Sequence, residues 1–157
     1  MVLRDAASRV GLWVLGLSFG ALAAVSSSQA AEAPGTIALS VSAFESDKGK
    51  LLIVLYDREE GFPTKPEKAA RRFVAPIVDK KVELEIPALG PGEYALSVVH
   101  DENGNGRLDS NLIGIPKEPV GVSNNAKGSF GPPKWKDAKF ALPAGSRVTQ
   151  KIVLRRI

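Results

Sequence analysis

Short apolar segments with the periodicity of β-strands are the feature that most constrains the fold of this chain. The segments "TIALSVSAF" and "KVELEIPAL" alternate apolar and polar residues, as a strand with one buried face does. The segment "KLLIVLYD" contains an unbroken apolar run from Leu51 to Tyr56, which suits a strand buried on both faces. Further candidates are "GEYALSVVH", "KFAL", "RVTQKIVLRRI" and the weaker "FVAPIVD", which Pro76 interrupts.

Turn residues between these segments favour a single all-β domain. Gly, Pro and Asn separate the segments, and Pro91-Gly92 directly precedes an alternating run. Six to seven short strands joined in this way predict one antiparallel Greek-key β-sandwich of the immunoglobulin-like (Ig-like) or transthyretin-like kind. One short helix is expected as well. Thr64 and Glu67 have the spacing of a capping box, which predicts one to two helical turns after the second strand.

The first thirty residues have the pattern of a secretory signal peptide. Arg4 and Arg9 come before or at the edge of an uncharged apolar stretch over 10–25, and Ser-Gln-Ala offers a cleavage site after Ala30. The stretch is shorter than the ~20 residues of a membrane span, so an uncleaved anchor is the weaker interpretation. We therefore expect a periplasmic or secreted protein, with removal of 1–30, one domain over 31–157 and no membrane anchor.

Charge and cysteine content narrow the possible partners. Residues 1–30 carry two Arg and one Asp, so the formal net charge of +4 falls to +3 for the rest of the chain. This positive charge is dispersed, whereas nucleic-acid binding needs a basic patch with aromatic residues between the basic ones. The chain has no Cys, hence no disulfide and no cysteine for lipid attachment. We expect a monomer with a cell-envelope partner, a protein or a glycan, and not nucleic acid.

A long segment over 101–136 departs from the strand pattern. It is rich in Gly and Pro, and a loop of this length in a compact domain is usually functional or tied down. It begins with "DENGNGRLD", in which oxygen-bearing residues recur at every second position and Gly106 permits a sharp bend. Five oxygen donors can converge on one cation here: Asp101, Asn103, Asn105, the backbone carbonyl of Arg107, and Asp109.

This spacing matches the first nine positions of the calcium loop of EF-hands. The twelfth position is Leu112 in place of a glutamate, and a strand precedes the loop in place of a helix. We therefore predict a structural Ca²⁺ loop outside an EF-hand, with a further ligand from Glu118 or Asn111 and a weak affinity of ~10⁻⁵–10⁻³ M. The open alternative is a double turn, because Asn-Gly occurs twice and forms tight turns without a metal.

The only histidine, His100, supports a rival class of function. With Asp101 or Glu118 it can be the general base of a small periplasmic hydrolase. By strand alternation it instead shares the face of Leu96 and Val98, which predicts a buried histidine that helps to hold the long loop. The sequence has no Cys, no second His and no Gly-x-Ser-x-Gly, so a non-enzymatic role is favoured.

The aromatic residues in "FGPPKW" suggest a third possible function, the binding of a ligand. Phe130 and Trp135, together with Tyr94, can form a platform for a sugar or a peptide, as in a carbohydrate-binding module. The alternative is that these rings fix the long loop to the sandwich.

The string "YALSVVHDENGNGRLDSNLIGIPKEPVGVSNNAKGSFGPPKWKDAKF", with "GKLLIVLYDREEGFP" upstream, resembles a family of small exported bacterial proteins catalogued only as a domain of unknown function. The resemblance covers about residues 35–157, and its central motif is H-D-x-N-x-N-G-x-L-D, then G-I-P-x-E and S-N-N. It implies an exported Ig-like or transthyretin-like sandwich and brings no activity or catalytic residue. The turn L-x-P-G-x-Y is also similar to that of carboxypeptidase-regulatory-like and collagen-adhesin B-type repeat domains, which are generally non-catalytic.

Overall fold

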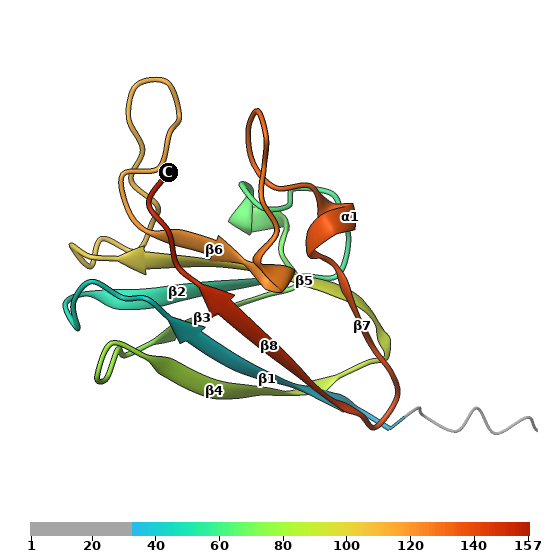
Figure 1. Ribbon diagram of the computed structural model, residues 1–157. Coiled ribbons are helices and arrows are strands. Elements are labelled where there is room, and N and C mark those ends of the chain that lie inside the picture. The colour runs from blue at the N-terminus through green and yellow to red at the C-terminus, as the bar shows by residue number, and fades with distance from the viewer. Residues whose placement is uncertain (1–32) are drawn as a thin grey trace, which may run out of the picture. The chain divides into compact units, whose positions relative to one another are not determined.

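Two β-sheets make up the body of the protein. The computed structural model describes residues 33–157, so the predicted signal peptide over 1–30 lies outside the described residues. Residues 33–157 belong to one compact unit. The smaller sheet has the strand order β4-β1-β8 and the larger one β3-β2-β5-β6, with β7 paired to another part of β5 (Figure 1). The prediction of an all-β, sandwich-like domain is confirmed at this level.

Most strands lie where the alternation of apolar residues predicts them. The strands are β1 (Gly35–Ser42), β2 (Lys50–Tyr56), β3 (Arg71–Ala75), β4 (Val82–Leu89), β5 (Gly92–Asp101), β6 (Val120–Val122), β7 (Phe140–Leu142) and β8 (Arg147–Val153). Strand β3 starts before the predicted segment and ends before Pro76, because proline cannot donate to a strand ladder. Strand β6 has no counterpart in the prediction, so the expected number of six to seven strands is too low.

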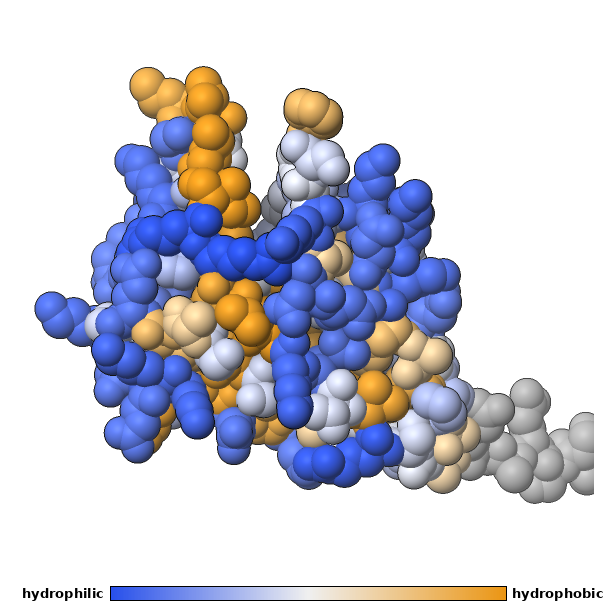
Figure 2. Space-filling view, viewed as in Figure 1, coloured by the Kyte–Doolittle hydropathy of each residue, from blue (hydrophilic) through white to orange (hydrophobic). Residues whose placement is uncertain are grey.

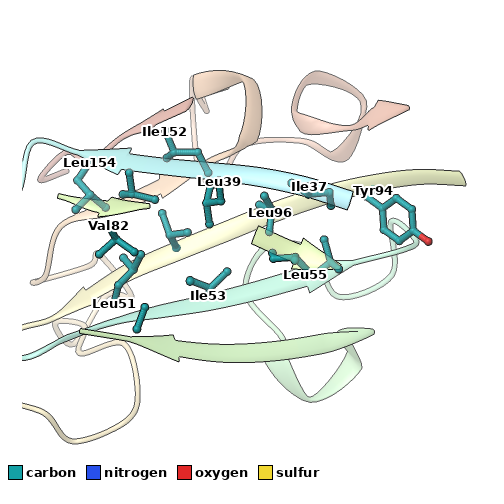
Figure 3. Packing of buried hydrophobic residues seen from close by; sticks show 14 of the residues in the cluster. Ile37, Leu39, Leu51, Ile53, Leu55, Val82, Tyr94, Leu96, Ile152 and Leu154 are labelled. Carbon is teal, nitrogen blue, oxygen red and sulfur yellow. The ribbon is translucent and has the colours of Figure 1, made fainter. Parts of the chain in front are cut away.

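The hydrophobic core lies between the two sheets. Alternate residues of β2 are 0% exposed, as expected for one face of a strand: Leu51, Ile53 and Leu55. Figure 3 shows these side chains directed toward the same interior as Leu39 of β1 and Leu96 of β5. Full burial of each such aliphatic side chain contributes roughly 1.5–3 kcal/mol, so this cluster is the main source of stability.

A second apolar cluster lies outside the main core. Its buried members are Tyr56, Ala95, Val122, Trp135 and Ala138. Two of them belong to a four-residue helix, α1 (Trp135–Ala138), which no sequence signal predicted. Strand β5 contributes side chains to both clusters, and every residue of that strand from Tyr94 to Asp101 is buried.

One strand pair is parallel, against the prediction of a wholly antiparallel sandwich. Strands β1 and β8 run parallel, with Thr36 opposite Arg147 and Ser42 opposite Val153. The preceding strand, β7, pairs with the other sheet. The chain therefore crosses between sheets before β8, and such a crossing does not impose the antiparallel direction that a hairpin imposes. The prediction is wrong at this pair.

The predicted helix after β2 forms only a single 3₁₀ turn, η1 (Pro66–Lys68). Its N-cap is Lys65, which makes no side-chain cap hydrogen bond, so the predicted capping box at Thr64 is wrong. A residue before proline is driven out of the helical region, and Lys65 has φ −116° and ψ 79°. In residues 33–157 no helix has the length and apolar character needed to cross a bilayer.

The long segment after β5 is divided by regular structure. Strand β6 pairs with β5 and is followed by a second 3₁₀ turn, η2 (Ser123–Asn125). Two irregular stretches remain on either side, over 102–119 and 126–134. Both contain loops that project in the same direction from the sheets (Figure 1).

Candidate functional site

The loop with the predicted ligands starts where β5 ends. His100 and Asp101 are the last two residues of the strand, and Asp101 lies opposite Lys50 of β2. Gly49 approaches this point closely with a φ of +75°, and a Cβ added to it would lie 1.9 Å from the carbonyl oxygen of Asp101. Only glycine fits there, so the base of the loop is tightly packed on the larger sheet.

The carboxylate of Asp101 organises the bend of the loop. Asp101 is 0% exposed. Its Oδ1 accepts a hydrogen bond from the N–H of Asn105 at 3.1 Å, and its Oδ2 accepts one from the N–H of Gly106 at 2.7 Å. Gly106 has a φ of +80°, which glycine adopts without steric cost. The first predicted ligand is thus buried and already surrounded by the loop.

Asn103 and Asn105 use both ends of their side-chain amides. Oδ1 of Asn103 accepts from the N–H of Asn105, and Oδ1 of Asn105 accepts from the N–H of Arg107, each at 3.0 Å. Their Nδ2 groups donate to the carboxylate of Asp109, Asn103 at 2.7 Å and Asn105 at 3.0 Å to both oxygens. The structure therefore brings four of the predicted ligand residues into one network.

Polar neighbours lower the pKa of Asp109. The hydrogen bond from Asn105 contributes most and that from Asn103 comes next, while the charges of Arg107 and Lys117 act in the same direction. Arg107 Nε lies 3.7 Å from Asp109 Oδ1, but the arginine side chain is 79% exposed, so solvent screens this ion pair. Asp109 is held as an anion chiefly by amide dipoles.

Glu118 closes the loop from the opposite side. It is 4% exposed, and its two oxygens accept the N–H groups of Glu102 and Asp109, both at 3.0 Å. These two groups lie near the start and the end of the loop, so Glu118 joins its ends. Glu118 and Asn111 were the two residues that the sequence suggested as the additional calcium ligand. In the structure, Glu118 contacts the loop. Asn111 instead forms a separate turn further along the chain.

The possible metal ligands of this loop are oxygens of three kinds: carboxylate, side-chain amide and backbone carbonyl. In residues 33–157 no three or more His, Cys, Asp or Glu side chains form a group that could hold a metal ion. A cation here would therefore need the amide oxygens of Asn103 and Asn105 and a backbone carbonyl, for which Arg107 is predicted, beside the carboxylates. Ca²⁺ accepts such donors in flexible geometry, whereas Mg²⁺ demands a near-ideal octahedron and Zn²⁺ prefers N and S ligands.

His100 is packed inside the sandwich. It is 0% exposed, its Nε2 is 2.8 Å from the carbonyl oxygen of Lys48, and its ring makes an edge-to-face contact with Phe44 at 5.1 Å. Nδ1 is buried and has no hydrogen-bond partner within the described part of the chain. The prediction of a buried, hydrogen-bonded histidine is confirmed. Its ring, however, bonds to the segment before β2 and not to the long loop that it was expected to hold.

The two aromatic residues predicted as a platform lie in different environments. Trp135 is only 9% exposed and packs edge-to-face on Phe62 at 5.8 Å, and Phe62 in turn contacts Tyr56 at 5.4 Å. Burial raises the pKa of Tyr56 to about 12. Phe130 is 106% exposed at the end of its loop. The structure therefore does not bring Trp135 and Phe130 together on one surface.

Ser123, the first residue of the S-N-N motif, has a structural role that the sequence alone did not predict. It is 0% exposed. Its Oγ accepts the N–H of Leu96 at 2.9 Å and donates to the carbonyl of Ala138 at 2.6 Å, so it links η2 to β5 and α1.

Asn124 and Asn125 continue this connection. Asn124 Nδ2 donates to the carbonyl of Lys139 at 2.9 Å. Asn125 Nδ2 donates to the carbonyl of Lys151 at 2.9 Å, and its Oδ1 accepts the N–H of Val153 at 2.8 Å. Both residues have positive φ, 58° and 50°, which asparagine tolerates better than most residues. Two adjacent asparagines were therefore the sequence feature that could have indicated this turn.

Comparison with known proteins places this domain among bacterial proteins. A family model described as an uncharacterized protein conserved in bacteria (DUF2141) matches residues 39–151. The chain belongs to this family. The match to the family spans the loop from Asp101 to Asp109, Glu118 and the η2 turn. No curated protein matches the chain, and no solved structure matches it.

Proposed function

We propose that this protein is an exported, non-enzymatic β-sandwich module whose surface loop binds one structural Ca²⁺. The proposed ligands are Asp101, Asn103, Asn105, the carbonyl of Arg107, Asp109 and Glu118. The three carboxylates among them do not form a metal-holding group in residues 33–157, so the loop would have to rearrange to bring them together around the ion. The observation that carries the proposal is the hydrogen-bonded loop in which five of the proposed ligand residues take part through their side chains.

The charge of the loop favours a cation. Asp101 and Glu118 are both buried carboxylates, and neither forms an ion pair with a Lys, Arg or His among residues 33–157. Their oxygens receive backbone N–H bonds, but a carboxylate has about four acceptor positions, so each retains acceptor capacity. Buried anionic oxygens of this kind are stabilised by a bound cation.

The ion would have a structural role. At a calcium concentration ten times Kd, binding to the folded state adds about 1.4 kcal/mol, enough to order a loop but not required for folding. The expected Kd of ~10⁻⁵–10⁻³ M suits the calcium levels met by periplasmic and secreted proteins. The loop would then hold a surface for a cell-envelope partner.

For the fold we propose the Greek-key arrangement of Ig-like or transthyretin-like sandwiches. Tyr94 supports this assignment, because its Oη donates to the carbonyl oxygen of Gly90 at 2.8 Å. A tyrosine that bonds back to the backbone a few residues upstream is a feature of Ig-like domains.

Thermal unfolding of residues 31–157 in EDTA and in millimolar Ca²⁺ tests the calcium proposal. We expect calcium to raise the unfolding midpoint of the wild type by about 5 °C. Asp109→Asn removes a ligand charge at a partly exposed position and should abolish most of this shift. Asp79→Asn is the matched control, because it makes the same charge change at an exposed turn outside the loop and should keep the full shift.

A second variant separates loss of the ion from loss of the fold. Asp101→Asn weakens the hydrogen bonds to Asn105 and Gly106, so it should be less stable than the wild type even in EDTA. Asp109→Asn, at a partly exposed position, should lose less stability in EDTA than Asp101→Asn does. An equal calcium shift in the wild type and in Asp109→Asn would overturn the proposal.

A further inference from the structure

Large apolar side chains are highly exposed at the ends of both projecting loops. Leu112 is 106% exposed and Ile113 80% exposed in the first loop, and Phe130 is 106% exposed in the second. Figure 2 shows hydrophobic residues at the ends of two separate projections that point the same way. Large apolar side chains exposed on two projections that point the same way suggest an interaction surface.

The first projection is an ordered turn, not a loose chain. Asn111 Oδ1 accepts the N–H groups of Ile113 at 3.1 Å and Ile115 at 2.9 Å. Ser110 and Pro116 form a β-bridge at the base of this turn. The apolar side chains are therefore held outward by specific backbone bonds, at an entropic advantage for any surface that receives them.

A basic hollow lies beside the second projection. It has a volume of about 290 Å³, and its lining includes Phe130 together with Lys127, Lys134 and Lys136. One carboxylate, Asp137, also lines it. None of these three lysines forms an ion pair with another of residues 33–157. The hollow thus joins an exposed aromatic ring to three free ammonium groups.

We propose that these two loop ends dock on an anionic phospholipid surface. Leu112, Ile113 and Phe130 enter the boundary between headgroups and acyl chains, and the lysines of the hollow contact lipid phosphates. This combination of inserted apolar residues and nearby cations is how peripheral proteins bind anionic lipids. The inference rests on the proposed binding role and names its partner, but it does not require the calcium ion.

The shape of the surface favours lipid over a protein partner. Figure 2 shows the two apolar ends as separate points and not as one continuous patch. A protein partner would need two matching pockets at a fixed distance, whereas a fluid lipid surface accepts separate insertions at any spacing. Exposed apolar side chains beside lysines also suit a bilayer interface, where acyl chains lie next to charged headgroups.

Sedimentation with vesicles tests this proposal directly. Residues 31–157 would be mixed with vesicles of phosphatidylcholine alone, or of phosphatidylcholine and phosphatidylglycerol in equal amounts. We expect binding to the anionic vesicles that weakens with salt, and little binding to phosphatidylcholine. Leu112→Ser/Ile113→Ser and Phe130→Ser should each reduce the partition coefficient by about tenfold or more, since each removes inserted apolar groups.

The matched control uses exposed valines elsewhere. Val74 and Val78 are 61% and 63% exposed, and β3, which carries Val74, is at the other edge of the larger sheet from β6. Val74→Ser/Val78→Ser should leave vesicle binding unchanged. Absence of binding by the wild type, or an equal loss in this control, would overturn the proposal.

Measurement in EDTA and in Ca²⁺ separates this inference from the calcium proposal. Vesicle binding that persists in EDTA and in Asp109→Asn, but is lost in Phe130→Ser, supports the lipid surface even where calcium has no effect on thermal unfolding. A calcium-dependent midpoint without vesicle binding contradicts only the lipid proposal.

Lys127→Gln/Lys134→Gln/Lys136→Gln should lower binding to anionic vesicles while keeping the unfolding midpoint, and a loss confined to the midpoint would count against the proposal.

Discussion

The two asparagine-containing parts of the long segment after β5 are held in opposite ways. In the loop over 101–109, the side-chain bonds of Asn103 and Asn105 reach residues at most six positions away. In the η2 turn, the side-chain bonds of Ser123, Asn124 and Asn125 reach residues 13 to 28 positions away, on β5, on α1 and the residue after it, and on β8.

This difference separates an adjustable region from a fixed one. Local bonds can rearrange around a ligand without disturbing the sheets, because both partners belong to the same loop. Long-range bonds connect strands and helix, so breaking them loosens the domain. Binding sites are commonly built on adjustable loops that a rigid scaffold positions. The loop over 101–109 has this character, and the η2 turn belongs to the scaffold.

The largest expected effect is at the junction between the adjustable loop and the scaffold. Gly49→Ala places a Cβ 1.9 Å from the carbonyl oxygen of Asp101 at a φ of +75°. We expect a loss of about 4 kcal/mol or more in the free energy of unfolding, measured in urea. Gly104→Ala is the control: its φ is also positive, +74°, but nothing lies within 4 Å, so the loss should be only about 1–2 kcal/mol.

A smaller effect is expected at the η2 turn. Ser123→Ala leaves the N–H of Leu96 and the carbonyl of Ala138 without this partner in a buried environment. The expected loss is about 2–3 kcal/mol in urea unfolding. Ser129→Ala, at an exposed position of the adjoining loop, should stay within about 0.5 kcal/mol of the wild type. Equal losses in the two variants would remove the distinction between scaffold and loop.

The smallest effect is the acid dependence of the loop over 101–109. Hydrogen bonds from Asn105 and Asn103 lower the pKa of Asp109 below its ordinary value of 3.8. A lowered pKa in the folded state means that the ionised carboxylate stabilises the protein above pH 3.8, and that this contribution is lost as the pH falls through the folded-state pKa.

Urea unfolding in EDTA at a series of pH values measures this contribution. The wild type should exceed Asp109→Asn in stability at neutral pH, and the difference should shrink below pH 3.8. The deficit of Ser123→Ala should persist across the same range, because no titrating side chain takes part in its bonds. If the difference in unfolding free energy between the wild type and Asp109→Asn did not change with pH, the ionised carboxylate of Asp109 would not be stabilised by the loop.

Much of the scaffold was predictable because the residue pattern within each segment indicates a strand. Alternation identified β1, β4 and β5, and an unbroken apolar run identified β2, while the segment of β8 was a further candidate. The same alternation predicted the burial of His100. Oxygen-bearing residues at every second position predicted the curled loop. Glu118 and Asn111 were the two candidates for an additional partner, and the sequence did not decide between them.

The remaining features depend on partners that are distant in sequence. The parallel pairing of β1 with β8 is set by a crossing between sheets, which periodicity within one strand does not report. Helix α1 has only four residues, and its Trp135 is buried because Phe62 and Tyr56 are there to receive it. The role of Ser123 likewise requires knowing that β5 and α1 meet at that point.

The most direct test of calcium binding at the adjustable loop is the NMR signal of side-chain amides during a Ca²⁺ titration. We expect the NH₂ resonances of Asn103 and Asn105 to shift, because their partner Asp109 and their own Oδ1 atoms would become calcium ligands. The NH₂ resonances of Asn124 and Asn125 should not move, because their bonds belong to the scaffold. Unchanged resonances of Asn103 and Asn105 in millimolar Ca²⁺, or equal shifts in all four residues, would contradict the account.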